Sequence, residues 1–272
     1  MADRAGQVEP GDPPGGPMRR NSVRRWLRRI WVAVGIAFMV WLAWNAQAHG
    51  VDPAVLRSTD EVLVVDSGPL LRFAPRWLSP GAGLIFLPGA AVEPAAYAPL
   101  LRAVAEAGFP ATLVRLPWRL APTAASRAVL WGRIAAIRAG DPSRRWLLAG
   151  HSRGAALSAQ FAAEHAQALS GLVLIGTTHP KRTSLGALAL PVTKVYGTRD
   201  CVAPVDAVLA NAHLLPDATH WVRLEGANHQ QFGWYGRQLG DCRATISRAA
   251  QQAATLRALL SALTAASAEP SR

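Results

Sequence analysis

Short apolar runs alternate with helix-like segments along most of this chain, and this alternation restricts the fold more than any other feature. The runs are AGLIFLPG, PATLVRLP, RRWLLAG, GLVLIGT, PVTKVYG and THWVRLEG, and helical periodicity lies between most neighbours. Strands joined by helices pair in parallel, and the helices then cover both faces of the sheet. Earlier in the chain, EVLVVD and PLLRFAP flank Ser67-Gly68. The sequence therefore predicts an α/β fold with a mostly parallel sheet that opens with an antiparallel hairpin.

Two of the helix-like segments have an apolar face. Tyr97, Leu100, Leu101 and Val104 are spaced i, i+3, i+4 and i+7, and Gly108 follows where a helix C-cap belongs. In the last segment we expect one face to hold Ile246, Ala249, Ala253, Leu256, Leu260 and Leu263. Both helices are predicted to pack on the sheet.

Length and composition fit one large domain preceded by a tail. The chain has 272 residues, of which 50% are hydrophobic and 17% are charged, as is typical of a globular protein. Residues 1–25 differ and are expected to form a disordered, basic, cytoplasmic tail. The formal net charge is +12, but the basic residues are scattered and lack the basic stripe with interleaved aromatics that nucleic-acid binding favours. We therefore expect a catalytic domain over residues 49–272 and no nucleic-acid partner.

An arginine-rich stretch followed by an apolar one predicts a membrane segment near the N-terminus. RRNSVRRWLRR covers residues 19–29, and residues 30–44 carry no charged side chain. Trp26 to Ala48 is long enough to cross a hydrocarbon core of about 30 Å. Because positive charges favour the cytoplasmic side, we expect a single-pass signal anchor over residues 26–48 in the cytoplasmic membrane, with the catalytic domain outside the cytoplasm.

The same segment allows two other interpretations. Ala46-Gln47-Ala48 fits the small-x-small rule of a cleaved signal peptide, in which case the mature protein would begin at His49. A buried core helix would explain the apolar run but not the arginines that precede it. We favour the anchor because the apolar run is rich in tryptophan and long for a cleaved signal.

The sequence Gly150-His151-Ser152-Arg153-Gly154 lies between an apolar run and a helix-like segment. This is the context of a nucleophile elbow, where a serine stands on a strained strand-to-helix turn and a side chain at either flanking glycine would clash. A serine that only caps the helix is the plainer interpretation, but a cap does not need the two glycines. Ser152 is therefore the candidate nucleophile.

A serine hydroxyl needs a base that removes its proton and an acid that orients the base. Asp200 follows the run VYG and His229 follows VRLEG, so both are expected at carboxyl ends of strands, where open α/β sheets place their sites. Each alone could be an ordinary loop residue, and Asp206 is a weaker acid candidate because it lies in a helix-like segment. The order serine, acid, histidine is the one expected on such a sheet. The other histidines are interpreted as structural or solvated.

Acyl transfer also needs backbone N–H donors for the negative charge that develops on the carbonyl oxygen. The loop FLPGAAVEP follows the first parallel strand and offers the Ala90 N–H, and the Arg153 N–H is the second candidate. Pro88-Gly89 could equally form an ordinary turn. The sequence has no metal-ligand spacing and no phosphate-binding glycine loop, so no metal and no cofactor are expected.

These segments together resemble the α/β-hydrolase fold-5 family, in its lidless, dienelactone-hydrolase-like branch. The resemblance covers about residues 50–265 and rests on LIFLPGAAVEP, AGHSRGA, VYGTRD and EGANHQQFGWYGRQLGDCRATISRAAQQ. It implies an α/β-hydrolase fold with Ser152, Asp200 and His229 as nucleophile, acid and base. The chain departs from the usual family pattern at Arg153, Ala155, Cys201 and Cys242. The arginine beside the nucleophile affects the expected substrate preference and leaves the triad intact.

The segment between Ser152 and Asp200 is too short for a lid domain, so we expect a shallow, open pocket. Trp118 and Phe232 are candidates for its lining, with core packing as the alternative. The expected activity is hydrolysis of a small-molecule carboxylic ester, or a similar acyl bond, through an acyl-enzyme on Ser152. An acyltransferase with the same triad and an inactive membrane-tethered binding protein are the alternatives. The sequence leaves the substrate and the oligomeric state open.

Cys201 and Cys242 are the two cysteines of the chain. Cys201 directly follows Asp200 and Cys242 lies in the segment after His229, so the two loops must meet if the acid is to orient the base. An exported domain lies in an oxidising compartment, where a disulfide persists. We therefore expect a disulfide between them, with two free thiols as the alternative.

Overall fold

The computed structural model describes residue 11, residues 18–77 and residues 81–268. It divides the chain into two compact units, Met1–Trp44 and Asn45–Arg272. Most of the tail expected over residues 1–25 lies outside the described residues.

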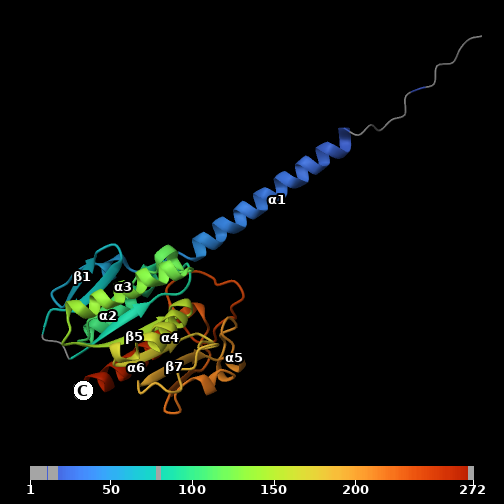
Figure 1. Ribbon diagram of the computed structural model, residues 1–272. Coiled ribbons are helices and arrows are strands. Elements are labelled where there is room, and N and C mark those ends of the chain that lie inside the picture. The colour runs from blue at the N-terminus through green and yellow to red at the C-terminus, as the bar shows by residue number, and fades with distance from the viewer. Residues whose placement is uncertain (1–10, 12–17, 78–80, 269–272) are drawn as a thin grey trace, which may run out of the picture. The chain divides into compact units, whose positions relative to one another are not determined.

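Helix α1, Met18–Asn45, accounts for nearly all of the described part of the first unit (Figure 1). It begins before the expected anchor, so the expectation of disorder is wrong for residues 18–25. Methionine and arginine are good helix formers, and Met18 and the four arginines of residues 19–25 extend the helix of the apolar run toward the N-terminus. Its Ser22–Asn45 part has 24 residues, and an 18-residue window within it has a mean hydropathy of 1.5. The helix is long and apolar enough to cross a membrane, as a cleaved signal sequence also can be.

The second unit is built on one eight-stranded sheet with the order β1-β2-β4-β3-β5-β6-β7-β8. The two pairings of β2, with β1 and with β4, are antiparallel, and every other pairing is parallel. The strands are β1 Val62–Asp66, β2 Leu70–Pro75, β3 Ala82–Leu87, β4 Ala111–Val114, β5 Arg145–His151, β6 Gly171–Ile175, β7 Val192–Gly197 and β8 His220–Leu224. The mostly parallel sheet and its N-terminal hairpin are therefore confirmed.

Helices cover both faces of this sheet (Figure 1). One core lies under α2, Ala98–Glu106, and α6, Arg248–Ala268, and the other under α3, Ala124–Gly140, and α4, Arg153–His165. A fifth helix, α5, covers Val205–Leu209. Short 3-10 turns are η1 Pro53–Leu56, η2 Pro94–Tyr97, η3 Pro117–Arg119, η4 Ala166–Ala168, η5 Ala212–Leu214 and η6 Gln230–Phe232.

The predicted apolar face is confirmed for α2 but not fully for α6. Tyr97, Leu100, Leu101 and Val104 are all buried at α2, and Gly108 has the positive φ of 96° that a C-cap glycine permits. The prediction for α6 holds only in part: Leu263 is buried and Leu256 and Leu260 pack half-buried against the core, but Ala249 and Ala253 are exposed and Ile246 precedes the helix. The buried residues of α6 are Gln251, Thr255, Ala258, Leu259, Leu263 and Ala266. Two of these are polar and satisfied by hydrogen bonds, so a purely apolar pattern could not locate the face.

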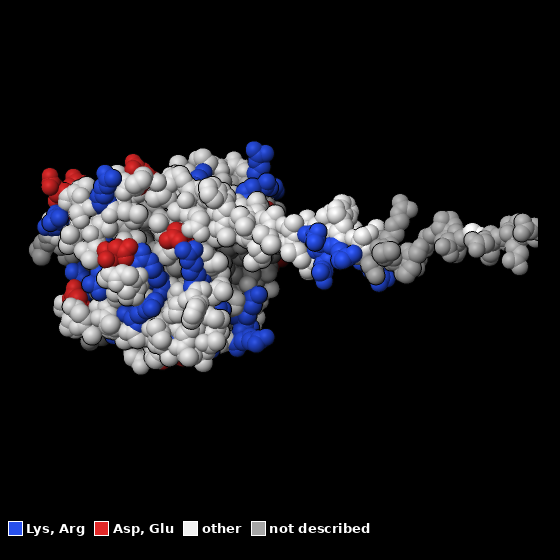
Figure 2. Space-filling model, turned by 90° about the horizontal axis from the view of Figure 1, so that it is seen from above, with Lys and Arg blue, Asp and Glu red and all other residues white. Residues whose placement is uncertain are grey.

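The parallel strands end at a common edge of the sheet, called here the catalytic edge. It consists of the loops that follow β3 to β8: residues 88–97, 115–123, 152, 176–188, 198–204 and 225–247; residues 189–191 lead to the start of β7 at the other end of the sheet. Residues 176–191, where a lid would be inserted, contain no helix or strand in the structure. On the face seen in Figure 2, basic side chains are scattered between acidic ones and form no continuous stripe.

Lys194 is a buried lysine in the middle of β7. Its side chain is withdrawn from solvent, and Nζ donates a hydrogen bond to the backbone carbonyl of His179. Burial disfavours the charged form and lowers the pKa of Lys194 from 10.5 to about 7. Near neutral pH this side chain is therefore partly uncharged.

The free energy of unfolding should consequently rise with pH between about 7 and 10.5. In this window the unfolded chain keeps the Lys194 proton and the folded chain has lost it, so a higher pH favours folding by up to about 1.4 kcal/mol per pH unit. Urea unfolding of the wild type and of Lys194→Met at several pH values measures this. We expect the wild type to gain stability relative to the variant as the pH rises; parallel curves would contradict the assignment.

Candidate active site

Ser152 stands on a sharp turn between β5 and α4. Its backbone has φ 52° and ψ −113°, a left-handed conformation that is strained for a residue with a side chain. Its side chain caps no backbone N–H of α4, so the helix-cap interpretation is not supported. A Cβ on Gly150 would lie less than 3.0 Å from the Gly154 backbone, and one on Gly154 less than 3.0 Å from the Leu87 carbonyl. Both glycines are therefore required by the turn.

His229 and Asp200 form a buried pair at the catalytic edge. His229 Nδ1 lies 2.8 Å from Asp200 Oδ2, and both side chains are almost completely withdrawn from solvent. The other carboxylate oxygen accepts hydrogen bonds from the Val202 and Ala203 N–H groups, at 2.9 and 2.7 Å. Because the carboxylate oxygen accepts, we assign the ring proton to Nδ1, which leaves Nε2 of His229 as a proton acceptor.

His151, the residue before Ser152, packs against His229. The two ring centroids are 4.6 Å apart. Its Nδ1 lies 2.8 Å from the Tyr97 hydroxyl, which in turn accepts the Gly89 N–H. Burial and the neighbouring His229 hold the pKa of His151 well below its usual range, so the ring is neutral. His151 is therefore structural, as expected, and brings the elbow against the base.

Three polar residues that the sequence analysis did not single out hold the base loop. Gln251 accepts the Asn228 N–H and donates to the Asn228 carbonyl, which fixes the backbone just before His229. Asp241 accepts the N–H groups of Gln230 and Cys201, so it joins the base loop to the acid loop, and burial raises its pKa. Two features of the sequence could have indicated these residues. One is a glutamine in an alanine-rich helix, and the other is an aspartate directly before each cysteine.

Cys201 and Cys242 form a disulfide, with their Cα atoms 5.2 Å apart. The bond joins the loop that carries Asp200 to the loop that carries His229. The convergence expected from the sequence is present.

Removing this bond should lower both stability and activity. The Cys201→Ser/Cys242→Ser double variant frees a loop with a sequence separation of 41. We expect the free energy of unfolding to fall by about 2–4 kcal/mol. Ester turnover should fall at denaturant concentrations that still leave the protein folded, since Asp200 is no longer held against His229. Urea unfolding by circular dichroism, run beside an activity assay, measures both; unchanged values for both would contradict this role.

The loop after β3 presents an unpaired backbone donor. The Gly89 N–H is taken by Tyr97 and the Ala91 N–H by the Arg119 carbonyl. Between them, the Ala90 N–H has no hydrogen-bond partner among the described residues. Arg153 is the first residue of α4, where the backbone N–H has no partner within the helix. The two predicted oxyanion donors are thus both available.

The side chain of Arg153 binds protein backbone. Its Nε and Nη2 donate to the carbonyls of Leu120 and Ala121, each at 3.0 Å. That loop holds Trp118, Arg119 and Ala121 in the left-handed region, which is unfavourable without such support. Arg153, at which the chain departs from the usual family pattern, therefore stabilises this loop.

The two predicted pocket residues lie in different surroundings. Trp118 is 84% exposed and lines a hollow of about 210 Å³ beside Pro88, Gly89 and Arg119. Phe232 is buried against the His151 ring, with centroids 5.4 Å apart. This burial fits the alternative interpretation of Phe232, core packing.

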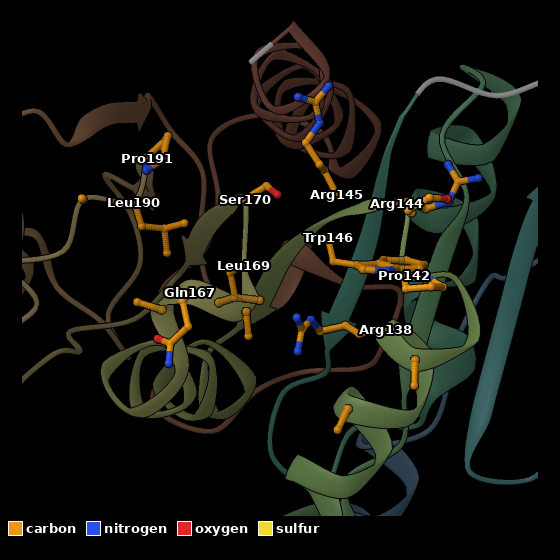
Figure 3. Close-up of a pocket in the computed structure, with 16 residues that line it drawn as sticks. Arg138, Pro142, Arg144, Arg145, Trp146, Gln167, Leu169, Ser170, Leu190 and Pro191 are labelled. Atoms are coloured by element: carbon orange, nitrogen blue, oxygen red, sulfur yellow. The ribbon is translucent and has the colours of Figure 1, made fainter. Parts of the chain in front are cut away.

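A larger hollow, of about 870 Å³, lies at the opposite end of the strands (Figure 3). Arg138, Arg145, Trp146, Ser170 and Leu190 are among its lining residues. They precede or begin β5, β6 and β7, so this hollow is remote from His229. The described residues contain no group of three or more His, Cys, Asp or Glu side chains that could hold a metal ion.

The fold and site place the chain among known proteins. The sequence profile of the alpha/beta hydrolase family matches residues 83–253, more than half of the chain, and the chain belongs to this family. No curated protein sequence matches it.

Solved structures share the fold. A dienelactone hydrolase-like protein from Klebsiella pneumoniae has 18% identity and a TM-score of 0.56, over 75% of this chain and 98% of that one. A serine hydrolase without a lid from Xanthomonas campestris has 17% identity and a TM-score of 0.53, over 79% and 99%. A bacterial membrane phospholipase A has 14% identity and a TM-score of 0.55, over 92% and 100%. At these identities the likeness shows the fold alone.

Proposed function

We propose that this protein is a serine hydrolase that cleaves a carboxylic ester through an acyl-enzyme on Ser152. The observation that carries the proposal is the buried pair of His229 and Asp200, 2.8 Å apart, beside the strained turn that holds Ser152. A site kept only for binding has no need of an oriented imidazole with a free Nε2. Fold membership supports the class of enzyme, and this geometry supports the proposed reaction.

The first half of the reaction acylates the enzyme. His229 Nε2 removes the proton of Ser152 as Oγ attacks the ester carbonyl carbon, and Asp200 holds Nδ1 and stabilises the imidazolium. The N–H groups of Ala90 and Arg153 donate to the oxygen that becomes negative. His229 then gives its proton to the alcohol as the ester C–O bond breaks.

The second half regenerates the enzyme. His229 removes a proton from water as the water oxygen attacks the acyl carbon. His229 then returns this proton to Ser152 Oγ as the bond from that carbon to Oγ breaks and the acid leaves. An acceptor alcohol in place of water would make the protein an acyltransferase.

Turnover of p-nitrophenyl esters of graded acyl length by the full chain in detergent tests the activity. We expect release of nitrophenol that requires Ser152, and free acid as the acyl product. The proposal fails if the folded protein hydrolyses none of these esters. If the acyl group is recovered as an ester of an added alcohol and no free acid forms, the result would favour the acyltransferase.

We also propose that α1 stays attached as a single-pass anchor in the cytoplasmic membrane, with the second unit outside the cytoplasm. Cleavage after Ala48 would remove Asn45 and Ala46, whose hydrogen bonds with the Gly236, Arg237 and Glu93 N–H groups belong to the second unit. The disulfide fits an oxidising compartment.

A reporter enzyme that works only after export tests this topology when fused to the C-terminus. We expect an active reporter, because the arginines before the apolar run favour the cytoplasm. A reporter that works only in the cytoplasm should stay silent in the same position. The reverse result, or mature protein that begins at His49, would contradict the anchored topology.

A further inference from the structure

The second unit begins beside the candidate active site. Asn45 is both the last residue of α1 and the first of the second unit. Its carbonyl accepts the Gly236 N–H at 2.8 Å, and its side-chain oxygen accepts the Arg237 N–H at 2.6 Å. Three residues later, Ala48 pairs with Tyr235. All three partners lie in the loop that carries His229, so the first residues of the second unit are held by the base loop.

A second set of contacts leads from this segment to Ser152. The Ala46 carbonyl accepts the Glu93 N–H at 2.7 Å, and Glu93 forms an ion pair with Arg119. Arg119 also accepts the Ala91 N–H, next to the proposed oxyanion donor. The next residue, Leu120, accepts a hydrogen bond from Arg153, which adjoins Ser152. Residues 45–48 therefore lie between the oxyanion loop and the base loop.

Large apolar side chains are exposed on both sides of this segment. Trp118, Leu120 and Leu239 are 84%, 40% and 64% exposed. Trp118 and Leu120 flank the arginine that pairs with Glu93, and Leu239 lies two residues after Arg237. Tryptophan with neighbouring arginine is the combination enriched where a protein meets the headgroup region of a bilayer.

The charge of the catalytic edge has the sign that anionic headgroups attract. Its exposed basic residues are Arg119, which pairs with Glu93, and the further five Lys181, Arg182, Arg199, Arg237 and Arg243. Among the described loops of this edge, the carboxylates are engaged: those of Glu93 and Glu225 in ion pairs, and those of Asp200 and Asp241 in hydrogen bonds. Each basic residue near an anionic surface contributes about 1 kcal/mol to attraction.

We propose that the catalytic edge rests on the bilayer that α1 crosses, and that the ester comes from an anionic lipid of that bilayer; this rests on the proposed anchored hydrolase. The lipid's acyl carbon forms a bond with Ser152 Oγ as its ester C–O bond breaks. Water then releases a fatty acid and the lipid remains with a free hydroxyl. Because the chain enters the domain at Asn45, the catalytic edge stays close to the bilayer. Ser152 can then reach a lipid ester, which is almost insoluble in water.

The test compares two esters in one preparation. The full chain is reconstituted into vesicles of phosphatidylcholine and phosphatidylglycerol that contain a phosphatidylglycerol with a fluorogenic acyl ester, and p-nitrophenyl acetate serves as the water-soluble ester. A fifteen-residue helical spacer between Trp44 and Asn45 lifts the domain by about 22 Å. The matched control carries the same spacer after Gly11, at the far end of α1.

We expect the spacer at Trp44 to lower lipid-ester turnover by at least about tenfold, because the bilayer is no longer held within reach of the site. The control spacer should lower neither turnover, and p-nitrophenyl acetate turnover should be equal in all three proteins. Leu239→Asp should also reduce lipid-ester turnover selectively, whereas Leu63→Asp, on the outer strand β1, should not. These two variants remain informative if the spacer impairs folding.

Equal lipid-ester turnover with and without the Trp44 spacer, together with no effect of Leu239→Asp, would overturn the inference. Cleavage of p-nitrophenyl acetate but not of the lipid ester would do the same and leave the proposed function standing. If the wild type cleaves neither ester, the proposed function itself fails.

Discussion

Replacing Ser152 with alanine is expected to lower kcat for a p-nitrophenyl ester by a factor of about 10⁴–10⁶. The variant keeps the elbow and the Asp200–His229 pair, so the protein should fold normally and still bind ester. What it loses is the oxygen that forms the acyl-enzyme in the proposed reaction. A loss smaller than about a hundredfold would mean that another group supplies the nucleophile.

A double variant makes this prediction sharper. His229→Ala should cost nearly as much as Ser152→Ala, and combining the two should cost little more than either alone, because the residues act as one unit. Asp206→Ala is the matched control, since Asp206 is an exposed aspartate on α5 and should leave turnover unchanged. Losses that multiply in the double variant would show that Ser152 and His229 act independently.

Replacing Gly154 with alanine is expected to lower the free energy of unfolding by about 3 kcal/mol. The added Cβ would lie less than 3.0 Å from backbone atoms of Leu87 and Pro88. Leu87 ends β3, which is paired on both sides, so this backbone has little freedom to move. The steric conflict therefore has to distort the elbow itself, and activity should fall with stability.

Gly132 provides the matched control for this substitution. It lies in α3, and a Cβ there would meet no atom within 4 Å. Gly132→Ala should raise stability by about 0.5–1 kcal/mol, because alanine favours a helix over glycine. Urea unfolding of both variants measures the contrast. Equal effects of the two substitutions would show that the close approach at Gly154 is not a constraint.

The parts of the fold that the sequence predicts are those governed by local pattern. Continuous apolar runs identify the buried parallel strands, and the spacing of Tyr97, Leu100 and Val104 identifies the face of α2. The candidate triad follows from strand ends, because successive parallel strands finish at the same edge of the sheet. The meeting of Cys201 with Cys242 follows in turn from the need to bring Asp200 to His229.

Other features depend on contacts between distant segments and leave little local signal. The buried face of α6 includes Gln251, which is buried because it makes two hydrogen bonds to the backbone of Asn228. The role of Arg153 depends on carbonyls of a loop that precedes it by about thirty residues. Asn45 and Ala46 read as the end of a membrane segment, yet they pair with loops near residues 93 and 236.

Mapping the adduct of a fluorophosphonate probe would identify the nucleophilic serine. Such probes modify a serine only when a neighbouring base activates it. The account predicts one adduct, on the peptide that contains Ser152, lost in Ser152→Ala and strongly slowed in His229→Ala. A folded wild-type protein that hydrolyses esters without acquiring this adduct, or that acquires it on a different serine, would contradict the account.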